Sequence, residues 1–174
     1  LLSKAADIGS EIHSYIHEHL KSELTGQETL TFALHAPSPA KQAFDAWLAW
    51  WKGSGLKPVR MEQTVWDVGL GYAGTIDLLA YDEAGRLGIL DLKTGKGVYD
   101  DHHLQVTAYM KAARNFADVE WAKIICVPKS MTDTHFIVKD LGEMYDRQLT
   151  EEQLMTAWTG AVMAWKVLLA KEAA

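Results

Sequence analysis

The chain has 174 residues, of which 48% are hydrophobic and 23% are charged, and its formal net charge is −6. This length suits a single domain over residues 1–174, and the composition excludes a disordered or fibrous protein. The negative net charge argues against a protein that coats nucleic acid through bulk electrostatics, although acidic metal ligands can supply part of that charge.

Cys126 is the only cysteine. It excludes disulfides within the chain, zinc sites made of cysteines, and iron–sulfur clusters held by four cysteines. A reducing compartment fits this count, so we expect a cytoplasmic protein. The longest apolar helical stretch, "AVMAWKVLLA", is short and contains Lys166, so we expect no membrane span.

Two helices are predicted in the first third of the chain. Apolar residues at helical spacing predict a helix over residues 2–24, ending near Gly26, and residues 25–39 are predicted to form a loop. Ser38 precedes "PAKQAFDAWLAWWKG", which predicts a capped second helix with proline in its first turn.

Three tryptophans stand at helical spacing in this second predicted helix: Trp47, Trp50 and Trp51. They could form a platform on which bases stack. Tryptophan at such spacing is more often part of the core, so the core interpretation is favoured.

The hydrophobic period changes at Val59. The segments "VRMEQTVWDV", "YAGTIDLLAY" and "RLGILDLKT" predict three strands joined by turns at "GLG" and "DEAG", which together form an antiparallel meander. A helix from Asp101 to Asn115 follows, then strands at "EWAKIICV" and "THFIVKD", and then a helix from Leu141 to Ala170. This order favours an α/β fold in which helices flank one sheet.

Three short motifs suggest other functions but lack the context those functions need. "GLGYAG", residues 69–74, matches the dinucleotide fingerprint, yet a strand pattern follows it instead of a helix, so a glycine-rich hairpin is favoured. "KTGKG" resembles a phosphate loop, but Leu90 stands where its first glycine belongs. "HSYIHEH" sets His13 and His17 one helical turn apart, as in a zinc pair, without the glutamate of HExxH.

Two carboxylates and an ammonium interrupt the apolar runs of the second and third predicted strands. Asp77 lies in the first run, and Asp91 and Lys93 lie two residues apart in the next, on one face of their strand. Charge at such positions is costly unless something neutralises it. Mg²⁺ or Mn²⁺ held by the carboxylates and the Leu92 carbonyl would do so, and Lys93 could then stabilise charge on a phosphate. The alternative is a plain Asp–Lys ion pair on a solvated face.

These residues resemble the PD-(D/E)XK nuclease superfamily, and within it the RecB-like exonuclease branch. Four segments carry the resemblance, in the order of that branch: "GSEIH", "GTID", "DLK" and "QVTAY". The resemblance implies a restriction-endonuclease-like core, with a central mixed sheet that contains the three-strand meander and is flanked by helices.

The same resemblance implies roles for individual residues. His13, Asp77 and Asp91 are expected to bind Mg²⁺ or Mn²⁺ together with the Leu92 carbonyl, and Lys93 is the expected catalytic lysine. Two further residues, Gln105 and Tyr109, are expected to contact DNA or orient that lysine. Glu62 is similar to an acidic residue often found near such sites.

The sequence departs from the motifs of the superfamily at two points, and these narrow the type of nuclease that is expected. Ile76 stands where the superfamily name has proline, which is common in this branch, and the cysteines of cluster-bearing relatives are absent. The chain is therefore expected to lack an iron–sulfur cluster and to be similar to phage recombination exonucleases or to the single-domain mitochondrial exonuclease. A phage or bacterial origin is expected, and the oligomeric state is left open.

The function that follows is a Mg²⁺- or Mn²⁺-dependent DNA exonuclease, which hydrolyses phosphodiester bonds by metal-activated water during recombination, repair or replication. DNA is the expected partner, together with a recombination or replication protein. Two alternatives stay open: a non-catalytic nucleic-acid-binding module with the same fold, and a metal-dependent enzyme that acts on another phosphoester.

Overall fold

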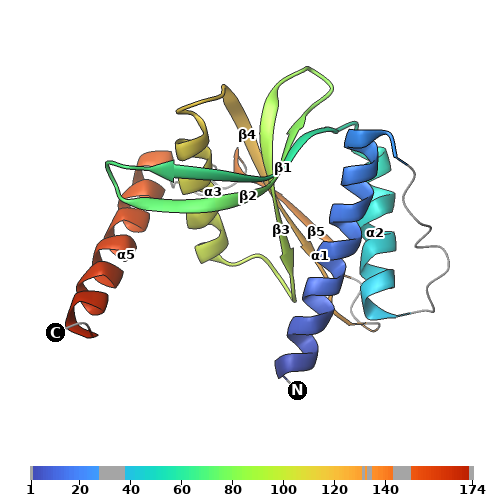
Figure 1. Ribbon diagram of the computed structural model, residues 1–174, viewed down its shortest axis with the longest axis horizontal. Coiled ribbons are helices and arrows are strands. Elements are labelled where there is room, and N and C mark those ends of the chain that lie inside the picture. The colour runs from blue at the N-terminus through green and yellow to red at the C-terminus, as the bar shows by residue number, and fades with distance from the viewer. Residues whose placement is uncertain (1, 28–37, 131, 133–134, 143–149, 173–174) are drawn as a thin grey trace.

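The computed structural model describes residues 2–27, 38–130, 132, 135–142 and 150–172 (Figure 1). A five-stranded sheet lies at its centre, with the strand order β1-β2-β3-β4-β5. The strands are β1 (Lys57–Asp67), β2 (Tyr72–Tyr81), β3 (Leu87–Thr94), β4 (Val119–Val127) and β5 (Ile137–Asp140). The helices of the described part are α1 (Leu2–Thr25), α2 (Pro39–Gly53), α3 (Asp100–Ala113) and α5 (Glu151–Glu172).

The sheet is mixed. β1, β2 and β3 pair antiparallel, which confirms the predicted meander, and β5 is antiparallel to β4. β3 and β4 are parallel, because α3 carries the chain back between them. This arrangement confirms the predicted α/β fold, and it places the carboxyl ends of β3 and β4 at the same edge of the sheet.

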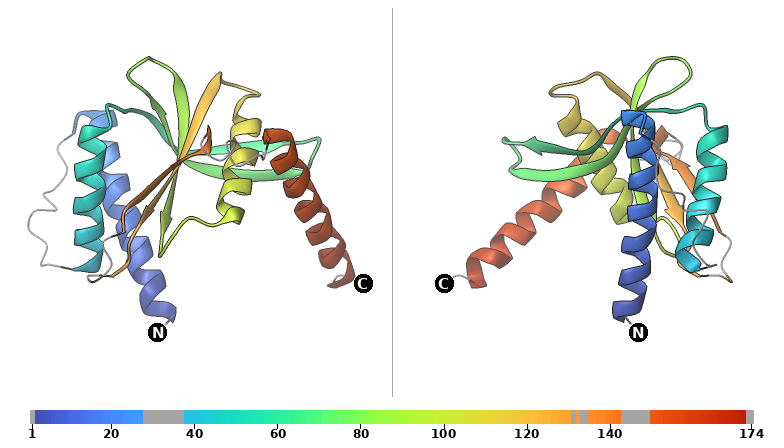
Figure 2. Two further views of the ribbon diagram at one scale, coloured as in Figure 1. Left: turned by 180° about the vertical axis from the view of Figure 1, so that it is seen from behind. Right: turned by 45° about the vertical axis from the view of Figure 1, so that its right-hand side comes forward.

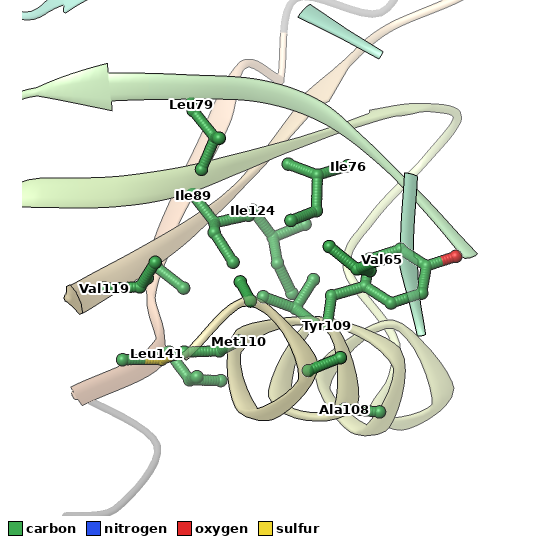
Figure 3. Packing of buried hydrophobic residues seen from close by; sticks show 14 of the residues in the cluster. Val65, Ile76, Leu79, Ile89, Ala108, Tyr109, Met110, Val119, Ile124 and Leu141 are labelled. Carbon is green, nitrogen blue, oxygen red and sulfur yellow. The ribbon is translucent and has the colours of Figure 1, made fainter. Parts of the chain in front are cut away.

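Helices cover both faces of the sheet, as the two views in Figure 2 show. α1 and α2 pack on one face, where Ile12, Ile16 and Trp47 meet Leu78 and Leu90. α3 covers the other face: in Figure 3, Tyr109 and Met110 of this helix lie under strand residues such as Ile76, Ile89 and Ile124. Within the described residues, no helix is long and apolar enough to cross a membrane.

The core interpretation of the tryptophans is confirmed. Trp47 and Trp51 are 2% and 4% exposed, and their rings stack at 5.5 Å. The indole N–H of Trp51 donates to the Glu23 carboxylate, which joins α2 to α1. Trp50 packs on Phe136. These side chains are therefore structural and not a platform for bases.

The glycine-rich segment after β1 is a hairpin turn, as predicted. Gly71 has a φ of 69°, a conformation that suits glycine, and its N–H donates to the Asp67 carbonyl. β2 starts at the next residue, so no helix aims its N-terminus at a dinucleotide.

The end of the chain departs from prediction. Leu141 and Gly142 are helical, as predicted, but the predicted helix from Leu141 to Ala170 is not continuous, because Thr150 is not helical and α5 begins at Glu151. Thr150 and Gln153 form reciprocal capping bonds there, a start signal that the apolar period alone does not show. Residues 143–149 of that prediction lie outside the described residues.

One predicted strand and one predicted loop also differ in their limits from the structure. The strand predicted at residues 134–140 is shorter, because β5 spans only Ile137–Asp140. In the predicted loop at residues 25–39, Thr25 belongs to α1 and Pro39 to α2, and residues 28–37 lie outside the described part.

Candidate active site

The candidate site lies where β2 separates from β3. The two strands pair as far as Leu78 and Leu90, so the same register would set Asp77 opposite Asp91. Instead of continuing the ladder, the Asp77 carboxylate accepts a hydrogen bond from the Leu92 N–H at 2.7 Å. The side chain of Asp77 thus replaces a strand partner at this point and is fixed against β3.

Asp91 and Lys93 lie on the α3 side of β3, where the strand period places both on one face. The Lys93 ammonium is 3.0 Å and 2.8 Å from the two carboxylate oxygens of Asp91, which is only 3% exposed. The ammonium also donates to the Gln105 side-chain carbonyl at 2.8 Å, and the Gln105 amide donates to the Tyr109 hydroxyl at 3.0 Å. A continuous hydrogen-bonded chain therefore runs from Asp91 to α3.

Gly74 explains how Tyr109 reaches this chain. A Cβ at Gly74 would overlap the Tyr109 ring, so only glycine lets α3 approach β2 so closely at this position. The glycine of "GTID" and the tyrosine of "QVTAY" are thus steric partners. The sequence shows each of them but not their contact.

Gly9 plays a similar part in α1. A Cβ at this position would lie 2.9 Å from both the Lys129 ammonium and the Thr94 hydroxyl, so the helix passes close to the end of β3. His13, one turn further along α1, is half-buried and lines the cavity described next. Gly9 and His13 thus lie on the part of α1 that passes close to the end of β3.

A cavity of about 300 Å³ lies between α1 and the sheet. Polar side chains on its wall include His13, His17, Glu62 and Asp77, and the remainder is largely apolar. Glu62 has a φ of 50° within β1, which is strained for a residue with a side chain. The His17 ring nitrogen lies 3.9 Å from the Glu62 carboxylate, so both belong to the rim and not to the hydrogen-bonded chain.

The electrostatics of the site favour a bound cation. Burial and, after it, the Asp91 carboxylate raise the pKa of Asp77 to about 6, although the Leu92 N–H and the Lys93 ammonium oppose the rise. Burial, followed by the Lys93 charge, lowers the pKa of His13. A buried carboxylate, Asp91, and a half-buried one, Asp77, repel each other near an imidazole whose pKa is lowered, and a divalent cation would stabilise this environment.

A comparison with models of protein families matches residues 2–170 to the PD-(D/E)XK nuclease superfamily. The chain belongs to this superfamily. A search of curated proteins found no match. Among solved structures, the chain is similar to one in a cryo-electron microscopy structure of a DrdV–DNA complex, with 16% identity and a TM-score of 0.26. The match covers 87% of this chain but 13% of the other, and so low a TM-score carries no argument.

PD-(D/E)XK nucleases typically use divalent metals. Among the described residues, no three side chains of His, Cys, Asp or Glu come together as a metal site. The donors nevertheless suit Mg²⁺ or Mn²⁺, which prefer carboxylate and carbonyl oxygen. Asp91 Oδ2 is buried, and Lys93 lies 2.8 Å away without hydrogen-bonding alignment, so this oxygen keeps an unused lone pair.

The structure brings the predicted site residues to one end of the sheet, though in two groups. Asp91, Lys93, Gln105 and Tyr109 form the hydrogen-bonded chain, and Asp77 joins them through the Leu92 N–H. The residues predicted around them, His13 and Glu62, line the cavity with Asp77. Their roles as metal ligands and substrate contacts stay predictions.

Sequence reasoning did not find Lys129, although its charge also lowers the pKa of His13. This lysine follows β4, whose carboxyl end lies beside that of β3. The parallel pairing of β3 with β4 is the signal that would have pointed to it, because parallel strands end at the same sheet edge.

Proposed function

We propose that the chain is a Mg²⁺- or Mn²⁺-dependent deoxyribonuclease of the RecB-like branch, and that it acts as an exonuclease on DNA. The observation that carries this proposal is the Lys93 ammonium, held between Asp91 and Gln105 at the point where Asp77 bridges the separating strands. Membership of a nuclease superfamily supports the same conclusion.

His13, Asp77, Asp91 and the Leu92 carbonyl would hold the cation. When bound, it supplies Lewis acidity toward the phosphate and toward water. The hydrogen bond from Leu92 N–H fixes Asp77, and burial keeps competing water away from Asp91. Burial, followed by the Lys93 charge, lowers the pKa of His13, which favours the neutral imidazole that a metal ligand requires.

Lys93 has the charge needed to assist phosphodiester hydrolysis. In this reaction water attacks phosphorus, the bond from phosphorus to the leaving oxygen breaks, and negative charge grows on the phosphate oxygens. The Lys93 ammonium would donate to one of these oxygens, since fixed donors that face developing charge lower the barrier most. Gln105, itself held by Tyr109, keeps the ammonium in place.

The test is a digestion of end-labelled DNA with Mn²⁺ or with EDTA, using substrates blocked at either the 5′ or the 3′ end. We expect cleavage with Mn²⁺, none with EDTA, and protection by one of the two blocks. Cleavage of doubly blocked DNA would identify an endonuclease. Absence of cleavage under all conditions would refute the nuclease proposal.

One observation favours a second candidate, a nucleic-acid-binding module without activity. Three metal-ligating side chains do not come together among the described residues. Such a module would bind the labelled DNA with and without EDTA and leave it intact. A panel of RNA, DNA and nucleotide substrates would reveal an enzyme that acts on another phosphoester.

A further inference from the structure

Three parts of the chain come close together at Gly9. The helix α1, the end of β3 at Thr94 and the segment after β4 converge there, and a Cβ on Gly9 would lie 2.9 Å from both the Thr94 hydroxyl and the Lys129 ammonium. In Figure 1, the tip of β3 and the N-terminal half of α1 lie at the same edge of the molecule. The hydroxyl and the ammonium thus lie close together, both against the backbone of Gly9.

The backbone around Lys129 holds it at this position. Thr94 pairs with Val127 in the parallel ladder, and the Gly95 N–H donates to the Val127 carbonyl at 3.0 Å. Val127 and Pro128 are buried, so the chain that leads into Lys129 is anchored in the core. The Lys129 side chain is half-buried, so the surrounding fold restricts where its ammonium can lie.

The charge of Lys129 has no obvious partner in the described part of the chain. Lys93 contacts Asp91 and Gln105, whereas no carboxylate among the described residues pairs with Lys129 within salt-bridge distance. Its ammonium is near enough to His13 to lower the pKa of that imidazole. A half-buried cation so close to the candidate site fits an anion that arrives with the substrate.

We propose that the Lys129 ammonium and the Thr94 hydroxyl bind a phosphate of the DNA backbone next to the phosphate that is cleaved. This inference rests on the proposed function, since it takes DNA as the substrate. A lysine and a hydroxyl are common donors to backbone phosphates, and such contacts fix register without reading sequence. The glycine at position 9 would then be needed because a side chain there would push the ammonium and the hydroxyl out of place.

The test measures binding of a fluorescein-labelled DNA oligonucleotide by anisotropy in EDTA, where metal-dependent cleavage does not occur. Lys129→Gln should weaken binding about three- to tenfold and lower the slope of log K against log[salt] by about one. Lys129→Arg should keep the salt slope of the parent. Thr94→Val should weaken binding without changing the salt slope. Lys52→Gln is the matched control, because Lys52 lies in the last turn of α2, near the opposite end of β3. It should change neither quantity.

The outcomes separate this inference from the nuclease proposal. If Lys129→Gln binds like Lys52→Gln, with the same salt slope, the phosphate site is wrong even if the parent cleaves DNA. Failure of the parent to bind DNA also overturns it. If Lys129→Gln alone loses affinity and slope while the parent cleaves nothing with Mn²⁺, the phosphate site stands and the nuclease proposal falls. Melting temperatures of all variants should agree with the parent, and Lys129→Arg tests the charge if Lys129→Gln does not fold.

Discussion

Asp91 and Lys93 touch each other, yet the proposed mechanism gives them different tasks. If the two residues formed only an ordinary ion pair, replacing either one would have a similar effect, because each replacement breaks the same contact. In the structure, Asp91 is almost fully buried, whereas Lys93 also reaches Gln105 on α3. These surroundings suit Asp91 for binding the metal and Lys93 for stabilising negative charge on the substrate.

We expect Asp91→Asn to weaken both Mn²⁺ binding and cleavage, because it removes a negative ligand. Lys93→Ala should leave Mn²⁺ binding intact, because it removes a positive charge beside the cation, and should reduce turnover by about 10²- to 10³-fold. Calorimetric Mn²⁺ titrations beside cleavage rates measure both effects. Cleavage by Lys93→Ala at the parental rate would contradict the mechanism.

Asp77 gives the metal-free protein a specific pH dependence. Its pKa in the folded state is about 6, raised first by burial and then by Asp91, against an ordinary value of 3.8. Between these two values the folded state holds a proton that the unfolded state has lost. The contribution of Asp77 to stability therefore falls as pH rises from about 4 to about 6, and Asp77 is unfavourable at neutral pH.

Asp77→Asn should remove this penalty, because the amide oxygen can still accept from Leu92 N–H without carrying charge. In EDTA at pH 7, we expect the variant to be more stable than the parent by about 1 to 3 kcal/mol, with a much smaller difference at pH 4. Urea denaturation at the two pH values measures this. A variant less stable than the parent at pH 7 would show that the carboxylate is not repelled there.

At the scale of elements, the site depends on contacts between segments that the sequence shows separately. The two residues Gln105 and Tyr109 are four apart and therefore share a face of α3, which the sequence predicts. That this face meets Lys93 depends on α3 packing across β3, and Gly74 permits this packing by leaving room for the Tyr109 ring.

Gln105→Ala should reduce cleavage while leaving the melting temperature nearly unchanged, because Gln105 is only half-buried and orients Lys93. Tyr109→Phe is the matched change, since it removes the hydroxyl that holds Gln105 and keeps the buried ring. It should reduce cleavage less. A large loss of stability in Gln105→Ala, with normal activity in the folded fraction, would show that the residue is structural.

The elements that could be predicted are those fixed by local signals. Turn residues and alternating apolar residues indicate the meander β1-β2-β3, and Ser38 with Pro39 marks the start of α2. The parallel pairing of β3 with β4 joins residues more than 30 positions apart, with no turn between them to reveal it. Lys129 was missed for this reason, and the break in the C-terminal helical region at Thr150 was missed because the capping residues Thr150 and Gln153 lie outside the apolar period.

At the scale of the whole molecule, the proposed metal ligands join parts of the chain that are far apart. His13 lies in α1, which packs on one face of the sheet, whereas Asp77 and Asp91 lie in the strands β2 and β3. His13 and Asp77 line the same cavity between α1 and the sheet. A cation bound by all three would hold α1 against the sheet, so metal binding and folding stability should be coupled.

Mn²⁺ should therefore raise the melting temperature of the parent, and the rise identifies the histidine that binds it. A metal at 100 times its Kd adds about 2.7 kcal/mol, which for a chain of this length corresponds to about 5 to 10 °C. The rise should nearly vanish in His13→Ala and persist in His17→Ala, because His17 faces Glu62 at the rim. The Mn²⁺-induced rise is compared within each variant by calorimetry, so a change in intrinsic stability does not confuse the result. An equal rise in both variants would place His13 outside the metal site, and a loss confined to His17→Ala would exchange the two assignments.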